Sequence, residues 1–206
     1  GVPHTEVGLL LANGEPVDFS YLVKPGDRIS VYPAFRSLAL GEAQRLREPV
    51  GGRPAFILDT HLGRLAGYLR MLGFDTLYCQ GCDDDYLAQR SASDERILLT
   101  RDRGLLKRSI VTQGYWVRAT DPEQQATEVL QRFGLVGSVL PFRRCMRCNG
   151  MLEPVDKAQV LDRLEPLTRQ HYDEFRTCTS CGAVYWKGSH HERMQELIRR
   201  LTQTSA

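Results

Sequence analysis

The sequence lacks any long hydrophobic run and any strong excess of one charge. No apolar stretch approaches the roughly 18 residues of a helical membrane span, and the opening residues do not follow a signal-peptide pattern. We therefore expect no membrane partner. The formal net charge of the 206 residues is only +2, so composition alone does not call for nucleic acid. Internal repeats are also missing, and 42% apolar and 25% charged residues are typical of a soluble globular protein.

Cysteines are few, and all six fall in three C-x-x-C pairs. Such pairs favour metal or redox chemistry over a disulfide framework, so we expect a reducing cytoplasm. The two later pairs place four thiols where they can converge on one tetrahedral Zn²⁺, each pair being followed by a glycine or an Asn-Gly. The expected ligands of this structural zinc ribbon are Cys145, Cys148, Cys178 and Cys181. Cys79 and Cys82 have no partner pair and are either a redox pair or ordinary buried cysteines.

The first 36 residues contain strand and turn signals. Asn13-Gly14 is typical of a tight hairpin, Pro25-Gly26-Asp27 indicates a second turn, and "RISVYP" alternates as a strand. This text resembles the last strands of a ubiquitin-like β-grasp domain, whose first hairpin and helix would lie upstream of Gly1. We therefore expect a partial β-grasp over 1–36 and a linker over 37–54, in which an internal Gly-Gly is only a flexible joint.

Residues 55–140 alternate between short apolar runs and amphipathic segments. The predicted strands are "AFILD" (55–59), "DTLYC" (75–79), "RILLT" (96–100) and "YWVRA" (115–119). The predicted helices are "HLGRLAGYLRMLG" (61–73), "DDDYLAQRSASDE" (83–95), "DRGLLKRSIV" (102–111) and "DPEQQATEVLQRFG" (121–134). This order predicts an open, mostly parallel α/β sheet with helices on both faces. Residues 141–206 would form the zinc ribbon, a helix near "DKAQVLDRL" and a last amphipathic helix.

Acidic residues follow the predicted strands. Asp59 and Asp102 end two of them, the run 83–85 follows another, and Asp121 follows the last. Ligands of open α/β sheets bind beyond the carboxyl ends of the strands. Carboxylates gathered there would repel one another unless a cation such as Mg²⁺ or Mn²⁺ neutralised them. Each acid could instead only cap the next helix. This reading is strongest for Asp121 and for one member of 83–85.

Several arginines surround these acids. Arginine forks match phosphate groups, and contacts to the backbone supply most nucleic-acid affinity. The candidates for RNA contact are Arg64, Arg70, Arg101 and Arg103. The plain alternative is that arginines near Asp102 pair with the aspartates, and that Arg64 and Arg70 have a structural role.

Four stretches together carry a family resemblance. They are "LDTHLGRLAGYLRMLGFDT", "DDDYLAQ", "ILLTRDRGLLKR" and "RCMRCNGML…CTSCGAVYWKGSHHERM". Over roughly residues 53–195 the chain resembles the Mut-seven C-terminal ribonuclease family, a PIN-like (Rossmann-like) nuclease domain with its own zinc ribbon. In some members a ubiquitin-like domain precedes the nuclease. The resemblance implies a metal-dependent ribonuclease in which Asp59 and Asp102 hold Mg²⁺ or Mn²⁺, supported by Asp84 and Asp85.

Three other functions are weighed against this one. A non-catalytic RNA-binding ribbon or toxin-type partner would use the acids only as caps, and a sulfur-carrier or ubiquitin-type adaptor would need a terminal Gly-Gly. A phosphatase of the haloacid-dehalogenase type would need an acid where His61 stands. The predicted function is therefore an RNA-cleaving hydrolase, with a possible protein partner for the ubiquitin-like segment.

Overall fold

A four-stranded parallel sheet forms the centre of the molecule. The computed structural model describes residues 2–33, 46 and 53–203. Its central strands are β4 (Ala55–Leu58), β5 (Asp75–Tyr78), β6 (Ile97–Thr100) and β7 (Gly114–Trp116). They pair in the order β5-β4-β6-β7, and all three pairings are parallel. The alternation of apolar runs and amphipathic segments thus correctly predicted the parallel sheet.

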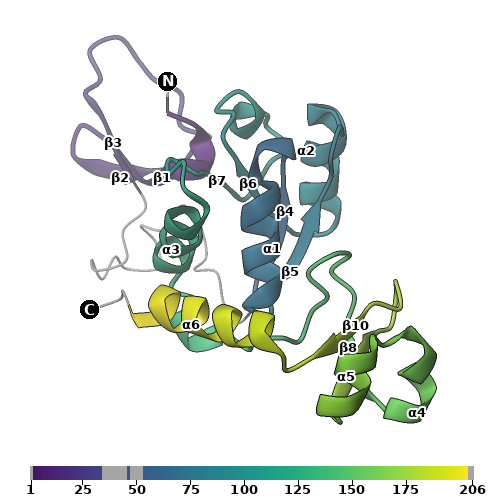
Figure 1. Ribbon diagram of the computed structural model, residues 1–206. Coiled ribbons are helices and arrows are strands. Elements are labelled where there is room, and N and C mark those ends of the chain that lie inside the picture. The colour runs from purple at the N-terminus through teal and green to yellow at the C-terminus, as the bar shows by residue number, and fades with distance from the viewer. Residues whose placement is uncertain (1, 34–45, 47–52, 204–206) are drawn as a thin grey trace.

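Helices cover both faces of this sheet (Figure 1). The helical elements are η3 (Thr60–Leu62), α1 (Gly63–Met71), α2 (Asp84–Ser93), η4 (Leu105–Lys107) and α3 (Pro122–Phe133). Phe56 and Leu58 of β4 point into one core with α1 and α3, while Ile57 points into a second core with α2 and η4. Because both faces are buried, the strand reads as a continuous apolar run.

One predicted helix is wrong. Residues 102–111 contain only the short 3-10 helix η4, which is followed by Arg108 in an extended conformation. The Asp102 carboxylate accepts a 2.6 Å hydrogen bond from the Gly104 amide, and this bond closes a tight turn in front of η4. Aspartate side chains favour such turns because their oxygens can accept from the backbone amide two residues on. The helix is short because the chain leaves the helical conformation at Arg108.

The N-terminal segment forms a small antiparallel sheet beside the central one. It contains η1 (His4–Glu6), β1 (Val7–Ala12), β2 (Glu15–Val17) and β3 (Ile29–Pro33), with the strands in the order β2-β1-β3. The predicted hairpin is confirmed, with positive φ angles at Asn13 and Gly14. The predicted linker 37–54, including its Gly-Gly, lies almost wholly outside the described residues, and all domain boundaries stay predictions.

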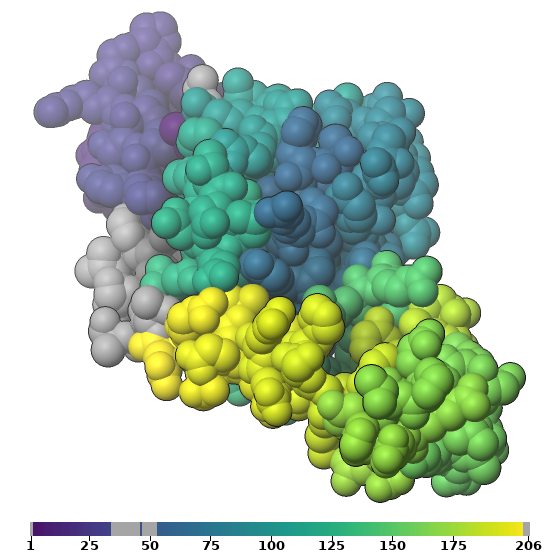
Figure 2. All heavy atoms as spheres, viewed as in Figure 1, coloured from purple at the N-terminus to yellow at the C-terminus, as the bar shows by residue number. Residues whose placement is uncertain are grey.

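The C-terminal part makes a ribbon and a returning helix. The strands of the ribbon pair in antiparallel fashion and are β8 (Leu152–Val155), β9 (Phe175–Cys178) and β10 (Val184–Trp186). The insert between β8 and β9 contains the short helices α4 (Lys157–Val160), η6 (Leu161–Arg163) and α5 (Pro166–His171). A short 3-10 turn, η5 (Val136–Ser138), leads into it. The last helix, α6 (Ser189–Gln203), buries Leu197, Ile198 and Leu201 in the core shared by α1 and α3. In Figure 2 the ribbon is a separate lobe beside α6.

No helix among the described residues combines the length and apolar character that crossing a membrane requires.

Candidate active site and cysteine metal centre

Asp59 is a buried acid that ends the central strand β4. Only 5% of its surface is exposed. One carboxylate oxygen, Oδ1, accepts a 2.8 Å hydrogen bond from the amide of His61, so Asp59 caps η3. The other, Oδ2, accepts hydrogen bonds from the Thr100 hydroxyl and from the amide of Arg101. The cap interpretation is correct for Asp59, but it accounts for only one of its two oxygens.

Thr100 connects the two acidic strand ends. This residue ends β6 and is fully buried. Its hydroxyl donates to Asp59 Oδ2 and accepts a 2.8 Å hydrogen bond from the amide of Asp102. Since β4 and β6 are neighbours, Asp59 and Asp102 follow adjacent strands at the same sheet edge.

This edge is the point at which the strand order reverses. The chain passes from β4 to β5 on one side and then returns to β6 on the other side of β4. The connections on the two sides go to opposite faces, and in open α/β sheets ligands bind beyond the carboxyl ends of the strands at such a point. Asp102 is exposed there, in the tight turn that Gly104 closes. The two acids that the sequence singled out therefore lie where an open α/β sheet binds ligands.

The other acids have different partners. Asp83 caps α2 through a 2.7 Å bond from the amide of Tyr86, and Asp121 caps α3 through bonds from the amides of residues 123 and 124. Asp84 and Asp85 both pair with Arg108, which follows η4. In the described part of the chain, the four cysteines are the only group of three or more potential metal ligands. The described acids thus do not form a group of three metal ligands by themselves.

Three of the four candidate arginines are exposed near the acidic edge. Arg64 stands in the first turn of α1, and Arg101 donates a 2.7 Å bond to the carbonyl of Ala119. The guanidinium of Arg103 lies 5.1 Å from the centre of the Trp116 ring, a cation–π contact. All three thus keep exposed surface, and two of them also contact neighbouring residues of the protein.

Arg70 differs from the other three because it is buried. Its exposed fraction is 7%, and its guanidinium donates to the carbonyls of Thr76, Met146 and Arg147. Those bonds tie the end of α1 to β5 and to the first cysteine knuckle. The structural alternative therefore describes Arg70 better than RNA contact does.

Four thiols converge in the ribbon, as predicted. The sulfur atoms of Cys145, Cys148, Cys178 and Cys181 all lie within 4.8 Å of one another. Burial opposes ionisation of Cys145, but hydrogen bonds from the Tyr185 hydroxyl and the knuckle amides lower the pKa of its thiol to about 6. Burial and its thiol neighbours raise the pKa of Cys148 to about 12. The sulfurs alone cannot share several negative charges, and this donor set fits Zn²⁺, which takes thiolates in tetrahedral geometry.

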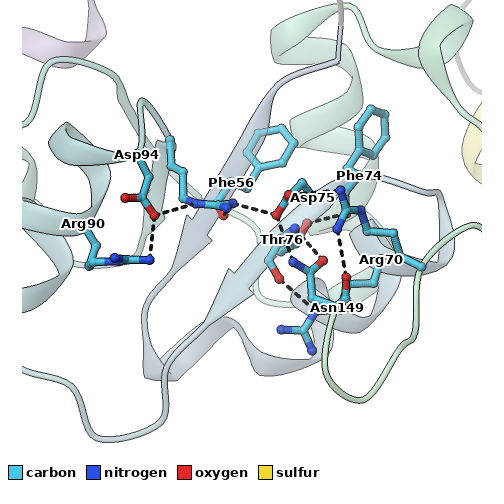
Figure 3. Close-up of polar contacts among 10 residues, drawn as sticks. Phe56, Arg70, Phe74, Asp75, Thr76, Arg90, Asp94 and Asn149 are labelled. Atoms are coloured by element: carbon cyan, nitrogen blue, oxygen red, sulfur yellow. Dashed lines mark hydrogen bonds and ion pairs between the residues drawn. The ribbon is translucent and has the colours of Figure 1, made fainter. Parts of the chain in front are cut away.

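The ribbon attaches at the end of the sheet where β5 begins, opposite the end that carries the acids. Asn149, just after the first knuckle, accepts a 2.9 Å bond from the amide of Thr76 and donates another to the carboxylate of Asp75, at the start of β5. Arg96 and Arg144 also pair with Asp75. Figure 3 shows this network joining β5, the end of α1 and the knuckle. Because β5 starts at this end, the four-cysteine cluster and the strand-end acids lie at opposite ends of the strands.

Cys79 and Cys82 form a disulfide in the loop between β5 and α2. Both are half-buried against the core that contains Leu87 and Leu98.

Two residues near the acids escaped the sequence reasoning. In the sequence Thr100 is only the last residue of a predicted strand, and a hydroxyl two residues before Asp102 in "LLTRD" is the signal that could identify it. In the sequence His61 serves only to exclude a phosphatase of the haloacid-dehalogenase type, which needs an acid at this position. Its Nδ1 lies 3.4 Å from Asp59 Oδ1, and 64% of its side chain is exposed.

Together these features define an α/β protein with two acids at adjacent strand ends and a separate cluster of four cysteines. The family model for the Mut7-C RNAse domain matches residues 54–198. That for the Mut7-C ubiquitin domain matches residues 1–39. The chain therefore belongs to the Mut7-C RNAse domain family, which assigns it a ribonuclease-type function. The comparison with curated proteins gave no match, and the comparison with solved structures gave none.

Proposed function

We propose that this protein is a metal-dependent ribonuclease that hydrolyses RNA phosphodiesters at the edge carrying Asp59 and Asp102. The family match supports RNA as the substrate class. The observation that carries the site assignment is the Thr100 hydroxyl, which bonds both the Asp59 carboxylate and the Asp102 backbone at the switch point of the sheet. Burying the Asp59 carboxylate costs free energy because it loses its water, and the three hydrogen-bond donors offset that loss. Such an arrangement is expected where the orientation of the carboxylate is important for function.

The residues present fit Mg²⁺ or Mn²⁺. Both ions prefer carboxylate oxygens, and Asp59 and Asp102 would hold the ion from neighbouring strand ends. When bound, such an ion activates water and stabilises the leaving oxygen of a phosphodiester. Asp59 Oδ1 accepts one amide bond, and a cation would bind its second lone pair. Asp84 and Asp85, paired with Arg108, would support the site by fixing the start of α2 against the end of η4.

The chain's own polar groups would do the remaining work. Thr100 and the Arg101 amide fix the orientation of the Asp59 carboxylate. His61 Nδ1, at the exposed rim beside Asp59, can hold or release a proton near the attacked phosphate. The exposed arginines Arg64, Arg101 and Arg103 would bind phosphates on either side of the scissile bond.

The test uses the zinc-loaded full chain and a labelled single-stranded RNA. Cleavage is measured with Mg²⁺ or Mn²⁺ added or omitted, without chelator, so that the ribbon metal stays in place. The variants are Asp59→Asn and Asp102→Asn, and the control is Asp162→Asn, an exposed aspartate of the ribbon insert. We expect cleavage that needs the added ion, is lost in both site variants and is kept in the control.

A second candidate function is a non-catalytic RNA-binding module. It is favoured by the observation that Asp59, Asp83 and Asp121 all cap helices and that the described acids form no group of three ligands. In the same experiment this protein would bind RNA without cleaving it, and Asp102→Asn would change nothing. That result would refute the nuclease assignment. A reducing cytoplasm and a protein partner for the ubiquitin-like segment also remain proposals.

A further inference from the structure

The N-terminal segment is docked directly beside the candidate active site. Its first element, η1, contacts η4, which follows the Asp102 turn, and β7, which pairs with the strand β6 that precedes the turn. The ring nitrogen Nε2 of His4 lies 2.8 Å from the carbonyl oxygen of Val111, between η4 and β7. In Figure 1 this segment lies against the β7 side of the sheet, at the far end of the molecule from the ribbon.

Glu6 accepts two hydrogen bonds across this contact. Only 9% of its surface is exposed. Its Oε1 accepts a 3.0 Å bond from the amide of Trp116, and its Oε2 accepts a 2.7 Å bond from the guanidinium of Arg118. Among the described residues β7 pairs only with β6, so its outer amides face no neighbouring strand. Glu6 supplies the acceptor that a further strand would otherwise provide.

From Trp116 the contacts lead to the Asp102 turn. The guanidinium of Arg118 lies 5.0 Å from the centre of the Trp116 ring, and that of Arg103 lies 5.1 Å from it. Such cation–π contacts restrict both the ring and the arginines. Arg103 is the central residue of the turn that Asp102 and Gly104 close. The backbone that carries Asp102 is therefore held on one side by Thr100 and on the other by Arg103 against Trp116.

We propose that Glu6 is a positioning residue of the nuclease site, so that the ubiquitin-like segment supports the site through Trp116, Arg103 and the Asp102 turn. This inference rests on the proposed function in treating Asp102 as a metal ligand. The physical reason is that small displacements of a reacting group cost large factors in rate. An exposed turn has few contacts of its own and needs an external support to keep its acid in place.

The first measurement reads the turn directly and needs no activity. Hydrogen–deuterium exchange of peptides covering 101–104 is compared in the full-length protein and in Glu6→Ala, Glu6→Gln and Glu15→Ala. Glu15 is the control because it is an exposed glutamate of β2 in the same N-terminal sheet. We expect faster exchange of the turn in Glu6→Ala and an unchanged rate in Glu15→Ala. Glu6→Gln keeps an oxygen for the Trp116 amide, so it should exchange at an intermediate rate.

The second measurement separates positioning from simple attachment. Cleavage of single-stranded RNA is measured on the same variants under conditions in which all are folded. We expect Glu6→Ala to lower kcat by roughly tenfold or more and to change KM much less, because Arg103 moves with the turn while the phosphate contact of Arg64 on α1 remains. Glu6→Gln should recover part of the loss. All variants carry Trp186→Phe, so that Trp116, the remaining tryptophan, reports through its fluorescence whether η1 is still docked.

Each outcome decides the proposal. Unchanged exchange of the turn in a folded Glu6→Ala variant overturns it, whatever the activity. A shifted Trp116 emission with an unchanged kcat also overturns it, since Glu6 would then only attach the segment. If the wild-type chain cleaves no RNA, the proposed function fails by itself. The exchange of the turn then still decides whether Glu6 positions it.

Discussion

At the scale of single residues, the main question is why a buried strand ends on an acid. Asp59 is almost fully buried, yet its carboxylate accepts bonds from two backbone amides and one hydroxyl. Hydrogen bonds to an ionised group stabilise more than neutral ones, and they replace the water that the acid loses on burial. Thr100 is the side chain in this set, so it is the residue at which the arrangement can be tested.

We predict that Thr100→Val weakens both the fold and the reaction. The two side chains have nearly the same shape, but valine leaves Asp59 without one donor and the Asp102 amide without its acceptor. The unfolding free energy in urea should fall by about 1–3 kcal/mol, and cleavage should fall with it. Thr100→Ser keeps the hydroxyl and is the matched control. Equal cleavage by both variants would show that the hydroxyl does not organise the site.

At the scale of elements, α1 carries two arginines with opposite surroundings. Its apolar positions, among them Leu65 and Leu69, are fully buried, as the leucine spacing predicted. Arg64 is exposed at its start, whereas Arg70 is buried at its end against three carbonyls. Helical spacing indicates the apolar face, but the exposure of a long polar side chain near the helix end depends on what packs there. Here the first cysteine knuckle packs there.

We predict that Arg64→Gln and Arg70→Gln have opposite effects. Arg64→Gln should weaken RNA binding and reduce its salt dependence by about one unit of slope, with the stability unchanged. Arg70→Gln should lower the unfolding free energy by about 1–3 kcal/mol, because buried carbonyls lose their donor, with RNA binding nearly unchanged. Fluorescence anisotropy at several salt concentrations and urea titrations measure the two quantities. Weaker RNA binding with unchanged stability in Arg70→Gln would show that Arg70 contacts RNA.

At the scale of the whole molecule, three units meet at different edges of one sheet. The N-terminal segment lies beside β7 and the acidic turn, whereas the ribbon attaches where β5 starts. Tyr185 of the ribbon bonds Cys145 and belongs to the metal centre, but Trp186 is 39% exposed and available for base stacking. An RNA bound at the acids must therefore extend along the molecule to reach Trp186.

We predict that the contribution of Trp186 depends on the length of the RNA. Trp186→Ala should leave cleavage of an RNA of about 4 nucleotides unchanged. The same change should weaken binding of an RNA of about 16 nucleotides, since single-strand binding sites span about 4–16 nucleotides. Trp186→Phe keeps an aromatic platform and is the control. Equal loss for both lengths would mean that the ribbon acts through the fold and not by stacking.

Local patterns in the sequence by themselves determined most of the elements and the chemistry of the zinc centre. Strand alternation, the Asn13-Gly14 turn, the Asp121 cap and the C-x-x-C spacing depend on neighbours a few residues apart. For this reason the parallel sheet, the hairpin and the four converging thiols agree with the prediction. The helix expected over 102–111 is reduced to η4, because the chain leaves the helical conformation at Arg108.

Only the tertiary structure decided which polar groups meet. The Thr100 bond to Asp59 joins residues 41 positions apart, and the Glu6 bond to Trp116 joins residues 110 apart. The burial of Arg70, the return of α6 to the core and the attachment of the ribbon opposite the acids likewise depend on contacts between distant segments. Hydrogen bonds and burial are fixed by positions in space. The residue types in the sequence limit which partners are possible, but the packing of the whole chain selects among them.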